Sequence, residues 1–258
     1  MGAKTVETIY AIGTLVVTLL VWELAVRLLG IPAYFIPAPS DIAVALERGR
    51  DLYAVNFLVT LSSTLAAFAI AFVSALVLAA LVSEVTFIRR TVNPLLVALQ
   101  AMPRIALAPV IIVWFGFGLG SKIVLGAFSA FFPIFVNAVH GMLAVESEQI
   151  ALMRTFRASR LQVFWKIKLP NALPFVLAGA NIGIIFAILG VIVGEFLGAN
   201  RGMGYLIVNQ SSQMDTAGVF ANVLILSATG VAFHYAVAWL RQRLLFWSAG
   251  SEVAGTKL

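Results

Sequence analysis

Long stretches without a single Asp, Glu, Lys or Arg residue dominate this sequence and constrain its fold more than any motif. Four of them contain 32, 23, 26 and 25 residues, namely Leu52–Ser83, Ile123–Val145, Leu169–Gly194 and Thr216–Leu240. A helix of roughly 20 apolar residues crosses the ~30 Å hydrocarbon layer of a bilayer. The four stretches therefore predict four membrane-spanning helices.

Two further stretches are apolar except for isolated charges. Ile9–Leu29 contains Glu23 and Arg27, which lie four residues apart and can pair across one helical turn, and Thr91–Phe117 contains Arg104. A basic start before an apolar stretch is also typical of a cleaved signal peptide, but the length and the charged pair favour a retained helix. We expect an all-α membrane protein that forms one transmembrane domain over residues 1–258. Its six predicted spans cover residues 8–29, 54–83, 91–117, 122–145, 170–196 and 216–241.

The composition agrees with lipid as the main solvent. Hydrophobic residues make up 62% of the chain and charged residues 11%, with a mean hydropathy of +1.03. A soluble domain averages about 45–50% apolar and ~25% charged residues. These values exclude a soluble enzyme, a disordered chain and a nucleic-acid-binding module. The absence of cysteine excludes disulfides and thiolate metal sites.

The net charge of +6 is best explained by membrane orientation. With both termini in the cytoplasm, 11 of the 17 cations but only five of the 11 acids lie on the cytoplasmic side. The whole net charge then falls on that side, as the positive-inside rule expects. The 11 cytoplasmic cations are Lys4, Arg89, Arg90, Arg154, Arg157, Arg160, Lys166, Lys168, Arg241, Arg243 and Lys257.

Two connections on the outer side are too long to be simple turns. In Gly30–Asn56 three prolines fix extended backbone, after which Ser40 or Asp41 can cap a short amphipathic helix. In Ala199–Asp215 glycines permit tight turns before the apolar segment Tyr205–Val208. This segment is too short to span, and we expect irregular backbone that dips into a cavity.

The cytoplasmic connection Glu146–Leu169 predicts a helix–turn–helix with one apolar face and many cations. Three interpretations fit this pattern. The segment can rest on anionic lipid, it can anchor the topology, or it can dock a soluble cytoplasmic partner.

Further residues of this connection resemble the membrane subunits of bacterial ATP-binding-cassette importers that depend on a separate solute-binding protein. In that family the loop reads Glu-Ala-Ala, three residues, Gly, nine residues and then Ile-x-Leu-Pro. Ile167–Pro170 matches the end of the pattern, whereas Arg157 stands at the glycine and Ala151–Met153 at Glu-Ala-Ala.

Other segments extend the resemblance over about residues 20–245. They are WELAVRLLGIPAYFIPAPSDI, AMPRIALAPVIIVWFGFGLGSKI, FFPIFVNAVHGM and GVIVGEFLGANRGMGYLI. They are similar to the permeases for nitrate, sulfonate, taurine and bicarbonate.

The resemblance implies a non-catalytic permease subunit of the bacterial inner membrane, with a cytoplasmic coupling helix between its fourth and fifth spans. It would pair with a second copy or a sister subunit, and bind two ATP-binding subunits and a periplasmic or lipid-anchored solute-binding protein. Membrane lipid surrounds it, and no nucleic acid is involved. ATP and Mg would be held by the partner subunits, since the cluster Gly116–Lys122 lacks the spacing of a phosphate-binding loop. The expected solute is small, and an organic or inorganic anion such as a sulfonate, nitrate or carboxylate is favoured.

The resemblance also assigns roles to residues. The expected ATPase-coupling residues are Glu148, Met153, Arg154, Phe156, Arg157, Ala158, Ser159, Leu169 and Pro170. A glycine at the Arg157 position would allow positive φ more cheaply. We therefore expect either a different turn, or a partner ATPase with a compensating groove, or a heterodimer with this subunit as the divergent half.

Candidate residues of the translocation pathway or gate are Pro103, Arg104, Glu195, Gly202 and Gly204. Arg104 either attracts an anionic solute or lies at a proline-broken helix end, because intramembrane charge usually faces protein or water. Glu195 either lines an outer gate, meets the solute-binding protein or marks the membrane interface. Lys122 and Arg201 are expected to be solvated outer charges.

An ion-coupled secondary transporter or a channel is the alternative from another class. Such proteins normally carry ionisable residues in the middle of spans, whereas Glu23, Glu84 and Glu195 lie near span ends. An integral membrane enzyme would need clustered His, Asp or Ser residues, which the sequence does not show.

Overall fold

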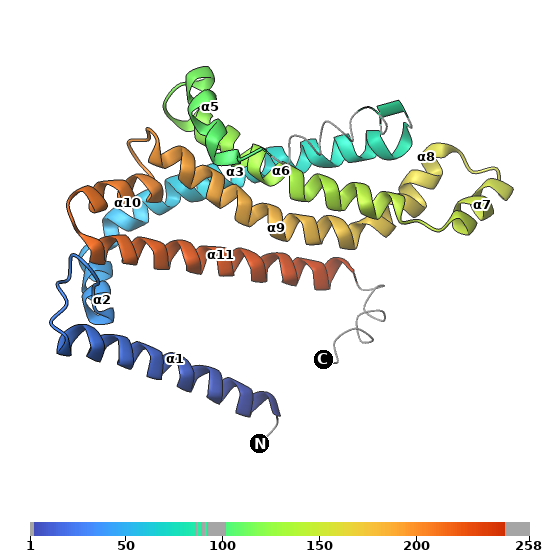
Figure 1. The fold of residues 1–258 in the computed structure, drawn as a ribbon. Helices are drawn as coiled ribbons and strands as arrows, with labels where there is room; N and C mark the ends of the chain where they lie inside the picture. Colours follow the sequence, from blue (N-terminus) through green and yellow to red (C-terminus); the bar gives the residue numbers. More distant parts are fainter. Residues whose placement is uncertain (1–2, 86, 89–90, 92–101, 246–258) are drawn as a thin grey trace.

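A computed structural model describes residues 3–85, 87–88, 91 and 102–245 of the 258-residue chain. The described residues form helices and connections without strands, which confirms the predicted all-α class (Figure 1). The helices are α1 (Ala3–Leu28), α2 (Pro39–Arg48), α3 (Arg50–Glu84), the 3₁₀ helix η1 (Arg104–Leu107), α5 (Ala108–Phe115), α6 (Leu119–Leu143), α7 (Ser147–Thr155), α8 (Arg160–Val163), the π-helix η2 (Phe164–Lys168), α9 (Leu169–Phe196), α10 (Met203–Ser212) and α11 (Thr216–Leu244).

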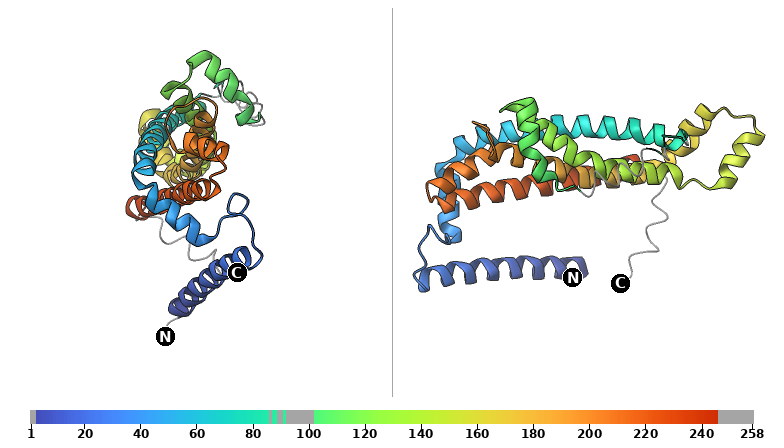
Figure 2. Two further views of the ribbon diagram at one scale, coloured as in Figure 1. Left: turned by 90° about the vertical axis from the view of Figure 1, so that its left-hand side faces the viewer. Right: turned by 45° about the horizontal axis from the view of Figure 1, so that its top comes forward.

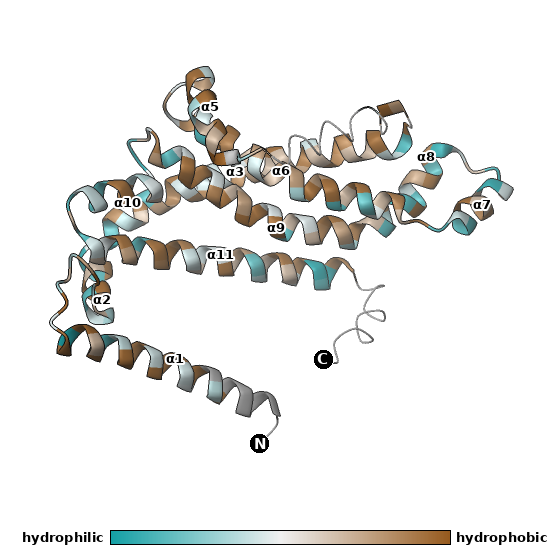
Figure 3. Ribbon diagram, in the orientation of Figure 1, coloured by the Kyte–Doolittle hydropathy of each residue, from teal (hydrophilic) through white to brown (hydrophobic). Residues whose placement is uncertain are grey.

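Four of the described helices are long and apolar enough to cross a membrane. They are α3, α6, α11 and the continuous helix Arg160–Phe196 that α8, η2 and α9 form together. Figure 3 shows apolar residues along these helices and polar residues at the two ends of the bundle. Long apolar helices are thus observed at four of the six predicted spans. The first and third spans stay predictions, since α1 does not count among these four helices and part of 91–117 lies outside the described residues.

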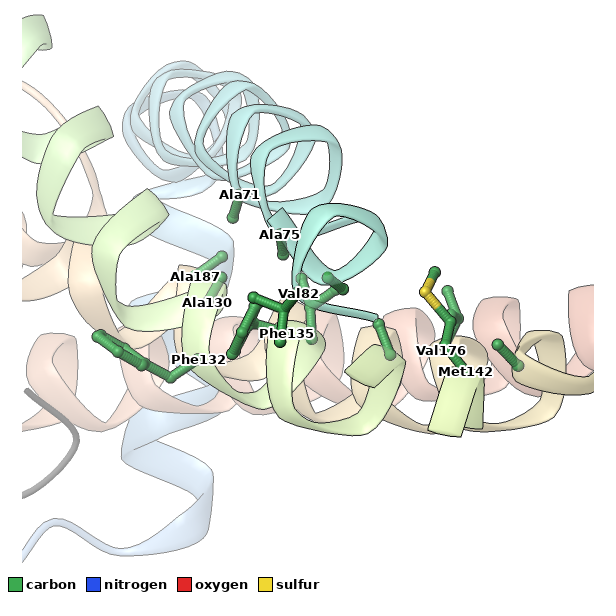
Figure 4. Packing of buried hydrophobic residues seen from close by; sticks show 13 residues of the cluster. Ala71, Ala75, Val82, Ala130, Phe132, Phe135, Met142, Val176 and Ala187 are labelled. Carbon is green, nitrogen blue, oxygen red and sulfur yellow. The ribbon is translucent and has the colours of Figure 1, made fainter. Parts of the chain in front are cut away.

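The buried face of α3 is made almost entirely of small side chains. Ala67, Ala71, Ala75 and Ala79 recur every four residues and are at most 1% exposed. Side chains four apart share one face of a helix. Figure 4 shows Ala71 and Ala75 of this face beside Ala130 and Phe135 of α6 and Ala187 of α9, which belong to the same buried cluster. Small side chains let the helix backbones approach closely, which is how helices associate in lipid.

Helices α6 and α9 make the closest contact in the bundle, and glycines make it possible. A Cβ atom added to Gly190 would lie 2.6 Å from the carbonyl oxygen of Leu125 and 2.7 Å from Cα of Gly126. On Gly194 it would lie 2.7 Å from Cα of Lys122. Real Cβ atoms essentially never come this close to other atoms. At these two positions the backbones of α6 and α9 can therefore touch only because the residue is glycine.

Most of helix α1 lies apart from the bundle (Figure 2), and it is joined to the bundle through α2 and through Trp22, whose ring lies 5.9 Å from that of Phe220 of α11. The predicted pair of Glu23 and Arg27 is confirmed at 3.1 Å, and Arg27 also binds Asp41 at 2.8 Å. The predicted short helix is confirmed as α2. The structure places its cap at Ala38, however, whose N–H donates to Asp41 Oδ2, so neither Ser40 nor Asp41 is the capping residue.

Alanine at Gly190 should destabilise the bundle, because the two nearest atoms that the new Cβ would meet belong to the backbone of α6 and cannot rotate away. We expect a loss of about 1–3 kcal/mol in the free energy of unfolding, measured by denaturation in detergent micelles. Gly230→Ala is the matched control, since its nearest atom, Ile185 Cδ1, would lie 3.7 Å away. Equal stability of the two variants would contradict the close contact.

Candidate functional site

The predicted outer connection Ala199–Asp215 contains a regular helix, α10. The prediction of irregular backbone at Tyr205–Val208 is wrong, because α10 runs through these residues at the end of the bundle opposite α7 and α8 (Figure 1). Helix formation satisfies the backbone hydrogen bonds internally, which removes the need for a polar cavity. The structure thus places a short helix, rather than a loop, over this end.

Side chains of neighbouring helices bind three successive N–H groups at the start of α10. Gly202 N–H donates to Asn56 Oδ1 at 2.7 Å, and Met203 N–H donates to Thr60 Oγ1 at 2.8 Å. Gly204 N–H donates to Glu195 Oε2 at 2.9 Å. The first N–H groups of a helix have no partner within it, and its N-terminus favours negative charge. The Glu195 carboxylate therefore supplies both a hydrogen-bond acceptor and a favourable charge.

A buried ion pair completes this group of residues. Lys122 Nζ lies 3.3 Å from Glu195 Oε1, and the two side chains are 3% and 0% exposed. Thr60 Oγ1 lies 2.9 Å from both carboxylate oxygens of Glu195. The expectation that Lys122 is a solvated outer charge is therefore wrong, while Arg201 is exposed as expected. We call Asn56, Thr60, Lys122, Glu195 and the Gly202–Gly204 backbone the Glu195 network.

Glycine is required at Gly202 for two reasons. Its φ of +124° and ψ of 165° belong to a region that is essentially restricted to glycine. A Cβ atom there would also collide with the Glu195 carboxylate. The predicted site residues Glu195, Gly202 and Gly204 are thus brought together because the two glycines leave room for the carboxylate.

A second group of hydrogen-bonded side chains holds the C-terminal end of α10. Gln210 Nε2 donates to the Tyr53 hydroxyl at 3.1 Å, and Asn222 Nδ2 donates to Gln210 Oε1 at 2.7 Å. These three buried residues come from α10, α3 and α11 respectively. Helix α10 is therefore fixed at both ends to spanning helices by side-chain hydrogen bonds.

Reasoning from the sequence missed most of these residues. Asn56 and Thr60 lie four apart in a charge-free stretch, which places two polar groups on one helix face. That spacing is the signal that could have found them. Nothing local pairs Lys122 with Glu195, which lie 73 residues apart in the chain.

An apolar cavity of about 470 Å³ lies between η1, α6 and α9. Its walls include Met102, Ile105, Leu125 and Phe186. Pro103 and Arg104 stand at the start of η1, immediately before Ile105, and Pro103 is exposed. The side chain of Arg104 lies outside what the structure describes. Among the predicted pathway residues, Pro103 and Arg104 lie in the chain between Met102 and Ile105, two residues that line this cavity. Glu195 belongs instead to the Glu195 network.

The predicted helix–turn–helix is observed as α7 and α8, and it projects beyond the end of the bundle (Figure 1). No residue of α7 is buried, and Leu152 and Phe156 are 59% and 76% exposed. At the second helix, Ser159 accepts from Gln162 N–H and its own N–H donates to Gln162 Oε1. This capping box defines where α8 starts.

Arg157 keeps the turn that a glycine would favour. Its φ is +55°, the left-handed conformation. Ala158 N–H donates to the Met153 carbonyl at 3.0 Å, and Arg157 N–H donates to the Arg154 carbonyl at 2.9 Å. This pair of bonds is the Schellman motif, which closes many helix C-termini with glycine at the left-handed position. Of the three alternatives expected for this position, a different turn is not required, because arginine adopts the left-handed conformation that a glycine would favour.

The remaining predicted coupling residues lie along the same segment. Glu148, Met153 and Arg154 are on α7, whereas Leu169 and Pro170 begin α9. A π-turn precedes Pro170, with the N–H of Leu169 donating to the carbonyl of Phe164. Proline cannot donate a helix bond and crowds the preceding turn, so a wider turn is the expected local adjustment.

The described residues include no group of three or more His, Asp or Glu side chains that could hold a metal ion. The Gly116–Lys122 cluster forms the turn between α5 and α6, where Gly116 and Gly118 have positive φ. Its Lys122 is bound to Glu195, so this cluster does not present a lysine to a phosphate.

The chain resembles transport permeases over nearly its whole length. Residues 67–246 match the family described as binding-protein-dependent transport system inner membrane component. The formylaminopyrimidine transport permease protein ThiX of Halalkalibacterium halodurans is 37% identical over 89% of this chain and 92% of its own. The riboflavin transport system permease protein RibX of Chloroflexus aurantiacus is 33% identical, and the taurine transport system permease protein TauC of Escherichia coli is 27% identical. Each of these two alignments covers 92% of this chain and 89% of the relative.

Solved structures share the fold. The methionine ABC transporter MetNI in an inward-facing conformation has a TM-score of 0.70 at 20% identity and covers 77% of this chain and 98% of its own. An amino acid ABC transporter has a TM-score of 0.62 at 16% identity, with coverages of 78% and 97%.

Methionine at Lys122 should destabilise the protein strongly, because it leaves the Glu195 carboxylate buried without its cation. Breaking one partner of a buried ion pair costs about 3–5 kcal/mol of unfolding free energy. The double variant with Glu195→Gln should recover much of this loss, since the amide oxygen can still accept from Gly204 N–H. Arg201→Met is the exposed control. Denaturation in detergent measures the wild type, the Lys122→Met and Glu195→Gln single variants, the double variant and the control, and an additive double variant would contradict the pairing.

Glycine at Arg157 should stabilise the end of α7 by about 1 kcal/mol, because it removes the cost of a side chain in the left-handed region. Valine should destabilise it, since β-branched residues tolerate this region poorly. Hydrogen exchange at the Phe156–Ala158 amides measures local opening. Faster exchange in the glycine variant than in the wild type would show that the Schellman motif does not control this turn.

Proposed function

Because the chain belongs to the family of inner membrane components of binding-protein-dependent transport systems, we propose that it is the translocation subunit of an ATP-driven importer. It would receive a small solute from a periplasmic or lipid-anchored binding protein and pass it into the cytoplasm by alternating access. Two ATP-binding subunits would supply the energy. The chain itself would hold no ATP or Mg and perform no catalysis.

The observation that carries the proposal is the exposed α7–α8 segment. Its apolar side chains lie beyond the bundle with none of α7 buried, which suits a helix that docks into a partner protein. We propose that the coupling residues around Arg157 seat in an ATP-binding subunit. The α8–η2–α9 helix would then carry motion from this contact into the bundle.

The Glu195 network supports a role for α10 as the outer gate. Side chains of α3 and α9 hold its N-terminus, and Tyr53 and Asn222 hold its far end. Any rearrangement of the spanning helices must therefore move α10 or break several buried hydrogen bonds. Rigid-body motion of packed helices is a common basis of two-state switching.

A small organic anion is the solute class we propose. Arg104 directly precedes Ile105, which lines the apolar cavity between η1, α6 and α9. We propose that Arg104 attracts the anionic group of the solute and that the apolar cavity receives a hydrocarbon part. The name of the taurine permease relative agrees with this class, since taurine is a sulfonate.

We also propose that both termini and the α7–α8 segment face the cytoplasm of a bacterial cell, with α2 and α10 on the outer side. The cation distribution supports this orientation. The translocation path would form between this chain and a second copy or a sister subunit.

Reconstitution separates this proposal from an ion-coupled transporter or a channel. The complex co-purified with its ATP-binding subunits, in proteoliposomes with the binding protein, should take up solute only when ATP is supplied. Uptake driven by an ion gradient through this chain alone would overturn the proposal.

Charge reversal at Arg157 tests the docking residue in the same assay. Glutamate there should lower ATP-dependent uptake by about tenfold, equivalent to ~1.4 kcal/mol at the interface. Arg157→Gly keeps the turn without the charge reversal and should retain uptake, and Arg243→Glu controls for charge elsewhere on the cytoplasmic side. Normal uptake by the Arg157→Glu complex would remove Arg157 from the coupling contact.

A further inference from the structure

An apolar groove runs along the face of α3 that points away from the alanine face. Two connected hollows of about 650 Å³ and 520 Å³ form it, and both are lined by Val77 and Leu81. Ile70 and Val73 line the first hollow, and Phe164 lines the second. The side chains of Ile70, Val73 and Val77 are more than half exposed, so within the described chain nothing covers them.

One end of the groove carries an uncompensated cation. Glu84 lines this end but is bound to Lys168, whose side chain is only 15% exposed. Arg160 lines it as well and makes no ion pair with any described residue. Arg160 lies four residues before Phe164 on one continuous helix, so both face the groove. The end of the groove therefore has a net positive charge.

The groove is long enough to hold a lipid acyl chain. From Ala69 to Val85 it extends about 24 Å along α3, given the ~1.5 Å rise per helical residue. Half of a bilayer's hydrocarbon layer is about 15 Å thick. With the end of α3 at the cytoplasmic membrane surface, as the proposed orientation places it, the groove would cover one leaflet and reach past the middle of the bilayer.

We propose that this groove binds one anionic phospholipid, with an acyl chain along α3 and the phosphate at Arg160. Guanidinium groups bind phosphate with two parallel hydrogen bonds, and such a contact would give Arg160 the partner it lacks. Basic sites between helices on the cytoplasmic side are typical places for anionic headgroups. The site goes beyond the proposed transport function and does not depend on which solute is carried.

Lipid binding to the purified full chain tests the site without any transport assay. Native mass spectrometry with phosphatidylglycerol and phosphatidylcholine should show preferential retention of phosphatidylglycerol. Arg160→Gln should weaken phosphatidylglycerol binding about fivefold, the equivalent of ~1 kcal/mol per cation near the surface, and leave phosphatidylcholine unchanged. Lys166→Gln, an exposed cation on the same helix that does not line the groove, is the matched control.

Blocking the groove tests the acyl-chain part. Val77→Trp fills the point where the hollows join and should reduce binding of both lipids, whereas Leu58→Trp changes an exposed residue of α3 outside the groove and should not. Helical circular dichroism confirms that each variant is folded. A photo-crosslinking residue at Val77 should capture lipid. Capture of a second permease or an ATP-binding subunit there, or unchanged binding in Arg160→Gln, would overturn the proposal.

Discussion

Contact between helix backbones is the constraint on which this bundle depends. In lipid, burial of apolar surface does not favour association of two apolar helices, so close packing has to supply the attraction. Gly126 and Gly190 bring α6 and α9 into backbone contact, and the alanine face of α3 lies against both helices. Some bulky apolar residues, such as Phe132 and Phe135 of α6, fill the core beside these contacts, whereas others, such as Val73 of α3 and Leu189 of α9, are exposed on the outside of the bundle. The arrangement of α3, α6 and α9 thus depends on the positions of glycine and alanine in these helices.

The same close contact explains how a charged pair is tolerated inside the bundle. Gly194 brings α9 against Lys122 of α6, and this places the ammonium group beside Glu195. An unpaired carboxylate at that depth would be costly, but here it accepts hydrogen bonds from Lys122, Thr60 and a backbone N–H. Backbone packing and electrostatics are therefore linked at one level of the bundle, directly beneath α10.

The sequence predicts the spanning helices well because their signal is local. Charge-free stretches long enough to cross a bilayer coincide with α3, α6, α9 and α11. The site was predicted less completely. Glu195, Gly202 and Gly204 are neighbours in the chain, but the burial of Lys122 depends on the contact between α6 and α9, which no local pattern contains. The sequence also left the conformation of Arg157 open, because the Schellman hydrogen bonds stabilise a backbone that its side chain disfavours.

The unbroken helix from Arg160 to Phe196 spans about 55 Å and connects the exposed segment to the Glu195 network. Gly179, Gly183, Gly190 and Gly194 pack its second half against α6, and the last of them directly precedes Glu195. The Glu195 end is therefore the fixed part of this helix, whereas its start at Arg160 lies before these contacts. A π-turn and Pro174 stand between the two parts, and such features are the usual places where a helix bends. A displacement of the helix start would thus be taken up as bending there before it reached Glu195 and α10.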